Sequence, residues 1–269
     1  MHWRYGMKAR IKALVLTYDK QIGLAQLLIK KYVSLGLGKY FTFVIPVNSL
    51  ESRFKIDGAK IQFVLSEPDI LSTIESLLSE VEDDEWVYWA IDDRYPMKVE
   101  CTKFKVIFDA LNTDVFKGIN GVKLLPWREP LAADKFSYKF INLQSQEPKT
   151  MFGFWHHHFL RSKVLKRMFL SENKQRENNI SLINNLYRDE DYLPFLEAIY
   201  VVDSPIIELA EPLFNGKLTL NGYRDLKTFN CELPDYKVID NNLAFYDCDE
   251  QMTLAPNKPK FVGSEYFEK

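Results

Sequence analysis

The chain has 269 residues, of which 46% are hydrophobic and 14% aromatic, so it holds enough apolar material for a sizeable core. Its 35 basic and 37 acidic residues give a net charge of −2, which provides no bulk field to attract nucleic acid. The three cysteines, Cys101, Cys231 and Cys248, form no C-x-x-C pair, which argues against a disulfide scaffold or a zinc–cysteine site.

Strand-like and helix-like segments alternate through the first half of the chain. Short apolar runs predict buried strands at residues 13–17, 40–46, 60–65 and 86–91. Apolar residues at helical spacing predict helices over residues 21–33, 70–78 and 104–111. This alternation predicts an α/β fold with a mostly parallel, doubly wound, Rossmann-like sheet flanked by helices.

The alternation weakens after about residue 122. We expect strands at residues 122–125 and 135–143, helices at 159–169 and 173–187, and short apolar runs at 198–202 and 206–209. The chain is expected to form one domain, with an α/β half at residues 1–125 and a mixed lobe at residues 126–256. Residues 257–269, rich in Lys, Pro and Glu, are expected to form a loose tail.

No stretch of the sequence approaches the roughly 20 apolar residues that a membrane span requires. The first residues are basic, but their apolar run at 13–16 is too short for the core of a signal peptide. The widely spaced cysteines are typical of a reducing compartment. A cytoplasmic location is therefore the expectation.

Two adjacent carboxylates, Asp92 and Asp93, follow the fourth predicted strand directly. Adjacent carboxylates repel each other, and a divalent cation shared with substrate phosphates is the usual compensation. The neighbouring Arg94 would either neutralise the pair or contact a phosphate. An acidic dipeptide is also common in solvated turns, which is the interpretation we give to Asp83–Asp84.

The ends of the predicted strands favour the first interpretation of Asp92 and Asp93. In open α/β sheets, ligands bind in the crevice outside the carboxyl ends of the strands. Tyr18 and Asp19 follow the first strand in the same way that the acidic pair follows the fourth. The sequence therefore predicts that these two strand ends share one ligand site.

Three segments together resemble GT-A-type nucleotide-sugar glycosyltransferases: Leu14-Val-Leu-Thr-Tyr-Asp19, Phe43-Val-Ile-Pro-Val-Asn48 and Glu85-Trp-Val-Tyr-Trp-Ala-Ile-Asp-Asp-Arg-Tyr-Pro96. In such enzymes the first strand end contacts the nucleotide, and a D-x-D-like motif holds Mn²⁺ or Mg²⁺ on the donor diphosphate. The resemblance implies metal ligation by Asp92 and Asp93, with Asp93 also catalytic. It implies donor contacts from Thr17, Tyr18, Asp19, Asn48 and Arg94. The departure is that Asp92–Asp93 lacks the middle residue of D-x-D.

A weaker resemblance, to uncharacterised bacterial glycosyltransferase-like proteins, continues through Glu211-Pro-Leu-Phe-Asn-Gly-Lys217-Leu-Thr-Leu-Asn221. It adds Lys217 to the expected donor contacts. Together the resemblances imply transfer of a sugar from a nucleotide-diphosphate donor, bound by residues 1–125, to a glycan or lipid-linked acceptor. Glu208 and Glu211 are candidates for the general base by neighbourhood only, with Glu211 the preferred catalytic residue.

Two other functions stay open on the sequence. Asp19 with Asp92 and Asp93 would also suit another metal-dependent phosphoryl enzyme, such as a nucleotidyltransferase or phosphohydrolase. A non-catalytic nucleotide- or sugar-binding module is the third hypothesis. A dinucleotide-binding enzyme is not expected, because no G-x-G-x-x-G motif follows any predicted strand.

Three consecutive histidines occupy positions 156–158. In a strand only His156 and His158 share a face, and the run lacks the i, i+4 pair of a zinc-binding helix. A zinc site built from this run alone is not expected. Either one of these two histidines completes the metal shell or contacts the diphosphate, or the run is a polar loop with one partly buried histidine.

A basic group follows the histidines in the predicted helix at 159–169. Its members are spread around the helix, which is typical of a solvated face. The alternative is attraction to an anionic acceptor or peripheral contact with a membrane surface. The group consists of Arg161, Lys163, Lys166 and Arg167.

Overall fold

The structure is a computed structural model that describes residues 10–111, 113–126, 131–146, 157–170, 198–214, 217–234, 238–240 and 260–261. The predicted helix at 173–187 lies outside these residues, as does the predicted tail apart from residues 260–261. None of the helices within the described ranges is long and apolar enough to cross a bilayer.

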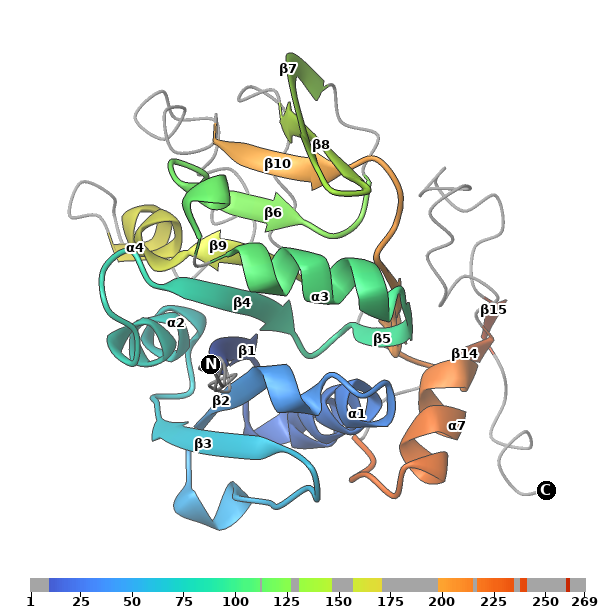
Figure 1. Cartoon of the computed structure of the whole chain (residues 1–269). Helices are drawn as coiled ribbons and strands as arrows, with labels where there is room; N and C mark the ends of the chain where they lie inside the picture. Colours follow the sequence, from blue (N-terminus) through green and yellow to red (C-terminus); the bar gives the residue numbers. More distant parts are fainter. Residues whose placement is uncertain are drawn as a thin grey trace, which may run out of the picture.

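A large sheet runs through the centre of the fold (Figure 1). Its nine strands within the described residues have the order β3-β2-β1-β4-β9-β6-β10-β8-β7. Their bounds are β1 (Ile11–Leu16), β2 (Phe41–Val47), β3 (Lys60–Leu65), β4 (Trp86–Ile91), β6 (Gly121–Lys123), β7 (Leu131–Tyr138), β8 (Ile141–Gln146), β9 (His158–Arg161) and β10 (Ile199–Val202). Only β8 and β9 run against their neighbours, which confirms the predicted α/β fold with a mostly parallel sheet.

Helices cover both faces of this sheet, giving three layers (Figure 1). Helices α1 (Ile22–Ser34) and α3 (Cys101–Ala110) pack on one face, and α2 (Ile70–Ser79) and α4 (Ser162–Leu170) on the other. Side chains of β4 alternate between the two cores, with Tyr88 on the α1 side and Trp89 on the α2 side. A strand buried on both faces reads as a continuous apolar run, which is why β4 was recognisable in the sequence.

Two smaller sheets complete the described chain. Strand β5 (Tyr95–Val99) pairs with β11 (Ile207–Ala210), and a four-stranded sheet contains β12 (Leu213–Phe214), β13 (Lys217–Thr219), β14 (Val238–Asp240) and β15 (Lys260–Phe261). Helix α7 (Leu220–Thr228) packs beside α1 (Figure 1). Short 3-10 turns lie at Asp19–Gln21, Gly38–Tyr40, Leu50–Ser52 and Asp114–Phe116.

Two sequence predictions for the second half were wrong. The single strand expected at 135–143 is a hairpin, with a turn between β7 and β8 where Lys139 has a φ of 55°. The helix expected at 159–169 begins only at Ser162, because His158–Arg161 forms β9 between β4 and β6. Phe159 and Leu160 face opposite cores, as a strand buried on both sides requires.

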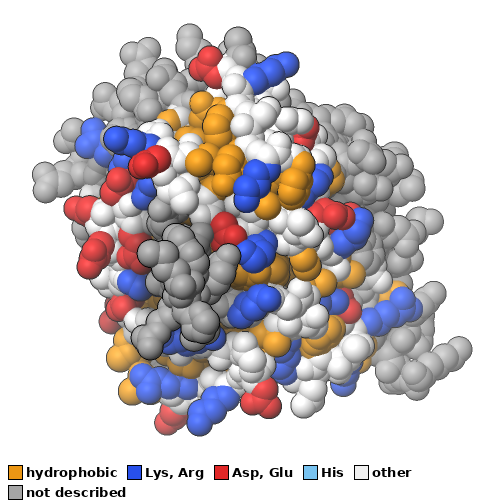
Figure 2. All heavy atoms as spheres, in the orientation of Figure 1, with side chains coloured by type: hydrophobic (Ala, Val, Ile, Leu, Met, Phe, Trp, Pro, Cys, Tyr) orange, Lys and Arg blue, Asp and Glu red, His pale blue; other side chains and the backbone are white. Residues whose placement is uncertain are grey.

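The basic group predicted after the histidines contacts the acidic turn at Asp83–Asp84. Lys163 Nζ lies 2.9 Å from Asp84 Oδ1, and Lys166 Nζ lies 2.7 Å from Asp83 Oδ1. These contacts support the solvated-face interpretation over attraction to an external anion. The face in Figure 2 likewise shows Lys and Arg interspersed with Asp and Glu, in keeping with the small net charge.

Gly23 lets the segment after α7 lie directly against α1. A Cβ atom at position 23 would stand 2.0 Å from the carbonyl oxygen of Glu232. Gln26 fixes the same contact, since its Nε2 donates to Glu232 Oε1 at 2.9 Å and its Oε1 accepts from Glu232 N at 3.1 Å. Close approach of two backbones therefore requires glycine here.

Replacing Gly23 by alanine is expected to lower the free energy of unfolding by about 1–3 kcal/mol, the usual cost of overpacking. The sign of this change in unfolding free energy tests the contact. In a helix interior without a close neighbour, replacing glycine by alanine stabilises the protein by roughly 1 kcal/mol. Urea denaturation of the two proteins gives the difference. A more stable variant would show that the segment around Glu232 does not pack on α1.

Candidate functional site

The strand order creates a switch point between β1 and β4. From β1 the chain adds β2 and β3 on one side, and β4 then pairs with the other side of β1. Connections that leave adjacent strands in opposite directions open a crevice at the carboxyl edge, where ligands of such folds bind. The residues that follow β1 and β4 therefore lie side by side at this edge, which is the candidate site.

A hydrogen bond spans this switch point. The hydroxyl of Thr17, just after β1, donates to Asp92 Oδ2 at 2.6 Å, and Asp92 N donates to the carbonyl oxygen of Leu16 at 3.2 Å. Both Thr17 and Asp92 are buried. The structure thus brings these two predicted site residues into direct contact and fixes the orientation of the Asp92 carboxylate.

Both carboxylates of the acidic pair are held where ionisation is costly. Burial raises the pKa of Asp92 well above its ordinary value, and the Asp93 charge raises it further, against the opposing effect of the Thr17 hydroxyl. Burial also raises the pKa of Asp93, to about 6, although Arg94 lowers it. Asp93 Oδ1 is buried and has no hydrogen-bond partner among the described residues. A cation placed here would restore the charged form of both groups.

Arg94 and Glu211 form an ion pair beside Asp93. Arg94 Nη2 donates to Glu211 Oε1 at 2.8 Å, and both side chains are largely buried. The Glu211 charge contributes to raising the pKa of Asp93, so the three groups share one electrostatic environment. The structure therefore brings Glu211, the preferred candidate for the general base, close to Asp93. It also shows that Arg94 forms an ion pair with Glu211.

Glu208, the other candidate base, lies elsewhere. It pairs with Lys98 at 3.0 Å across β11 and β5, and the side chains of both residues are exposed. Glu211 directly follows the end of β11. The hydroxyl of Thr219 donates to the backbone carbonyl oxygen of Glu211 at 3.1 Å. Thr219 also caps α7 by accepting from Gly222 N at 2.9 Å. This arrangement fixes the backbone that carries Glu211.

Asp19 and Asn48 organise the neighbouring loops at the same edge. Asp19 Oδ1 accepts from Asn48 N at 2.7 Å, and Asp19 Oδ2 accepts from the Ser52 hydroxyl at 2.6 Å. Asn48 Nδ2 donates to the carbonyl oxygen of Ser66 at 3.0 Å, which ties the end of β2 to the end of β3. Both oxygens of Asp19 are thus engaged, while Tyr18 beside it is 38% exposed.

The histidine run lies partly within the described residues. His156 lies outside the described residues. Lys217, a predicted donor contact, has its backbone in β13, but its side chain is not among the described parts. His158 is fully buried on β9, opposite Trp89 of β4 and Lys123 of β6. His158 therefore lies in a buried strand of the sheet and not in the polar loop that the sequence offered as one alternative.

His157 is the residue that the sequence reasoning missed. It is fully buried, with Nδ1 2.7 Å from the Tyr32 hydroxyl and Nε2 3.1 Å from the carbonyl oxygen of Ile91, the residue before Asp92. The Tyr32 hydroxyl lies 2.8 Å from that of Tyr88. Burial lowers the pKa of His157 to about 3, so it is neutral at physiological pH. A pattern of three histidines gives no indication which one supports the strand end.

The described residues contain no cluster of three or more His, Cys, Asp or Glu side chains that would hold a metal ion by themselves. A cation such as Mg²⁺ commonly needs only one or two carboxylates, with substrate phosphates and water completing its shell. The buried, unpartnered Asp93 Oδ1 beside the buried Asp92 suits that mode. The residues present therefore fit a cation that binds together with a diphosphate.

No protein-family model matches the chain, and no curated protein matches it in sequence. In structure it is similar to S. aureus TarS, residues 1–349, at 12% identity and a TM-score of 0.47, covering 74% of this chain and 60% of that one. The same region of TarS in complex with UDP-GlcNAc gives 13% identity, a TM-score of 0.43 and coverages of 74% and 58%. The chain is also similar to the galactosyltransferase LgtC in complex with donor and acceptor sugar analogues, at 11% identity and a TM-score of 0.40. This match covers 89% of this chain and 91% of LgtC. The chain thus spans less than two thirds of the TarS structures.

Proposed function

We propose that this protein is a glycosyltransferase that binds a nucleotide-diphosphate sugar through Mn²⁺ or Mg²⁺ at Asp92 and Asp93. The observation that carries the proposal is the buried Asp93 oxygen without a partner, beside a second buried carboxylate at the switch point of the sheet. A buried acceptor that lacks a donor is costly unless a ligand satisfies it. The sequence resemblance to GT-A enzymes supplies the sugar nucleotide as that ligand.

Each residue of the site has a part in this chemistry. Breaking the bond from the sugar to a diphosphate builds negative charge on the leaving group, and a bound divalent cation stabilises that charge as a Lewis acid. Asp92 and Asp93 would hold the cation, and the hydrogen bond from the Thr17 hydroxyl fixes the orientation of the Asp92 carboxylate. We assign to Tyr18, an aromatic side chain that is 38% exposed, the role of stacking on the base or the sugar of the donor.

The acceptor is proposed to be a glycan or a lipid-linked saccharide, which binds on the side of the second half of the chain. An acceptor hydroxyl must lose a proton during an inverting transfer, so a carboxylate base is needed in the crevice. Glu211 is our candidate, because it lies beside Asp93 whereas Glu208 does not. Its ion pair with Arg94 would open as Arg94 turns toward the diphosphate, leaving the carboxylate accessible.

Thermal shift measurements with a panel of nucleotide sugars, with and without Mn²⁺, test this function. Mn²⁺ and the correct donor together should raise the melting temperature, and saturation at about 100 times the dissociation constant corresponds to roughly 2.7 kcal/mol. The Asp93→Asn variant should lose this response, and the matched variant at the exposed Asp114, Asp114→Asn, should keep it. A melting temperature unmoved by every nucleotide tested would contradict the proposal.

The phosphoryl-enzyme alternative has less support from the structure. It required Asp19 to join Asp92 and Asp93 at the metal, but the two oxygens of Asp19 already accept hydrogen bonds from Asn48 and Ser52. The products distinguish the two reactions. Transfer of a hexose with release of the nucleoside diphosphate supports the glycosyltransferase, whereas release of pyrophosphate or free phosphate supports the alternative.

A further inference from the structure

A basic pocket lies at the other end of the strands from the candidate site. It has a volume of about 590 Å³ and is lined by Arg10, Lys12, Thr42, Lys60 and Gln62. These residues stand at the starts of three parallel strands, and Lys12, Thr42 and Lys60 are level with one another across β1, β2 and β3. Since Asp92 and Asp93 follow the carboxyl ends, the basic pocket is separate from the proposed donor site.

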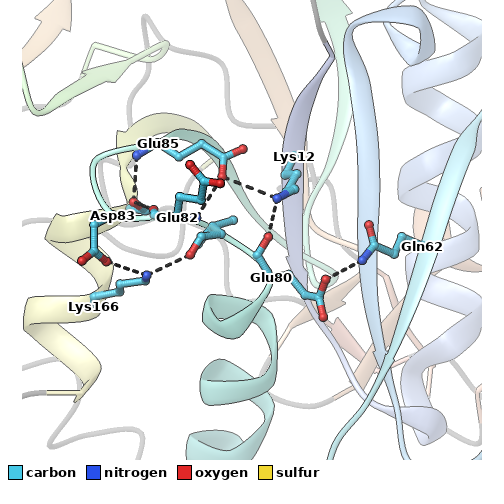
Figure 3. A network of polar contacts seen from close by, with 9 residues as sticks. Lys12, Gln62, Glu80, Glu82, Asp83, Glu85 and Lys166 are labelled. Atoms are coloured by element: carbon cyan, nitrogen blue, oxygen red, sulfur yellow. Dashed lines mark hydrogen bonds and ion pairs between the residues drawn. The ribbon is translucent and has the colours of Figure 1, made fainter.

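Acidic residues of the turn between α2 and β4 fix two side chains of the basic pocket (Figure 3). Lys12 Nζ donates to the backbone carbonyl of Glu80 and lies 3.5 Å from Glu85 Oε2. Gln62 Nε2 donates to Glu80 Oε2 at 2.5 Å. Lys12 and Gln62 are therefore held in place before any ligand arrives, and the charge of Lys12 is compensated in part.

The remaining side chains of the basic pocket are available to a ligand. Arg10 and Lys60 are exposed, and neither has an ion pair or side-chain hydrogen bond within the part of the chain that the structure describes. Thr42 is only 7% exposed, yet its hydroxyl also lacks a partner among those residues. Two cations and a hydroxyl are thus donors without acceptors among the described residues, which matches the oxygens of a phosphate group.

We propose that the basic pocket binds a phosphate-bearing anion. Arg10 and Lys60 contact its oxygens as charge-assisted donors, the Thr42 hydroxyl donates at the floor, and Lys12 adds positive potential. Two sources carry this chemistry: a soluble phosphate compound and the phosphate headgroup of a lipid. The inference does not depend on the proposed transferase activity, because it uses none of the residues at the carboxyl edge.

Calorimetric titration of the full chain with inorganic pyrophosphate, in EDTA and at low ionic strength, tests the soluble source. EDTA prevents binding through a cation at Asp92 and Asp93. Lys60→Gln and Arg10→Gln should each weaken binding by about tenfold, since each removes one charge-assisted contact. Thr42→Val should weaken it less, while Lys117→Gln, at an exposed lysine on another surface, should leave it unchanged.

Co-sedimentation with phosphatidylcholine vesicles, with and without phosphatidic acid, tests the lipid source. Binding that requires phosphatidic acid and is lost in Lys60→Gln but kept in Lys117→Gln assigns the headgroup. Pyrophosphate binding with the same variant pattern, without vesicle binding, assigns a soluble ligand. The proposal is overturned if neither probe binds, or if Lys117→Gln reduces binding as much as Lys60→Gln does.

Discussion

Replacing Asp93 by asparagine is expected to stabilise the ligand-free protein by about 3 kcal/mol at pH 7.5 while abolishing its response to Mn²⁺ and nucleotide. The pKa of Asp93 rises from an ordinary value of 3.8 to about 6 in the fold, chiefly through burial. About two pKa units correspond to about 3 kcal/mol, which the folded state loses when Asp93 ionises. Asparagine carries no charge and avoids that cost.

The pH dependence gives the sign of this effect. Between pH 3.8 and about 6 the folded state binds more protons at Asp93 than the unfolded state does, so stability falls as pH rises through that window. The advantage of Asp93→Asn should therefore be full above pH 6 and absent below about pH 4. Measuring the difference between variant and parent cancels groups that Asp93 does not influence, such as His157, whose lowered pKa acts in the opposite direction. Asp92 does not cancel, because the Asp93 charge raises its pKa, and the loss of that charge adds to the advantage of the variant.

Urea denaturation of both proteins from pH 4 to pH 8 supplies the measurement. The matched variant Asp114→Asn, at an exposed site, should differ from the parent by less than about 0.5 kcal/mol at every pH. A destabilised Asp93→Asn protein at pH 7.5 would show that Asp93 makes favourable contacts as a carboxylate without any ligand. Higher stability combined with a lost ligand response is typical of a residue that serves binding at the expense of the stability of the ligand-free fold.

Replacing Asp225 by alanine is expected to cost about 3 kcal/mol, because it leaves a buried lysine without its counter-ion. Lys31 is only 9% exposed, and its Nζ lies 3.2 Å from Asp225 Oδ2. The Tyr95 hydroxyl donates to the same oxygen at 2.6 Å. One carboxylate thus joins α7 to α1 and to β5, the strand that follows the acidic pair.

A second substitution separates the lost ion pair from a general loss of packing. Adding Lys31→Met to the Asp225→Ala protein removes the unpaired charge and should recover much of the stability. The pair Lys105–Asp109, in which the lysine is exposed and the aspartate is partly exposed, serves as a control, since Asp109→Ala should cost less than about 0.5 kcal/mol. Equal losses in the single and double variants, measured by urea denaturation, would contradict this account.

The sequence alone determined the half of the fold that carries the carboxylates. Strands β1, β2 and β4 are buried on both faces, so their apolar runs are continuous, and each ends where polar residues begin. Parallel strands joined by helices place their carboxyl ends at one edge, which is why Tyr18–Asp19 and Asp92–Asp93 were predicted to share a crevice. That prediction needed no knowledge of distant contacts.

Only the tertiary structure decided the second half and the pairing within the site. A four-residue strand such as β9 is too short for its period to be recognised beside a following helix, and its position between β4 and β6 depends on residues far along the chain. The ion pair of Arg94 with Glu211, 117 residues away, and the burial of His157 behind Ile91 depend on the same long-range packing. Local patterns indicate which residues can ionise or coordinate, but burial and distant neighbours set their charge state and partners.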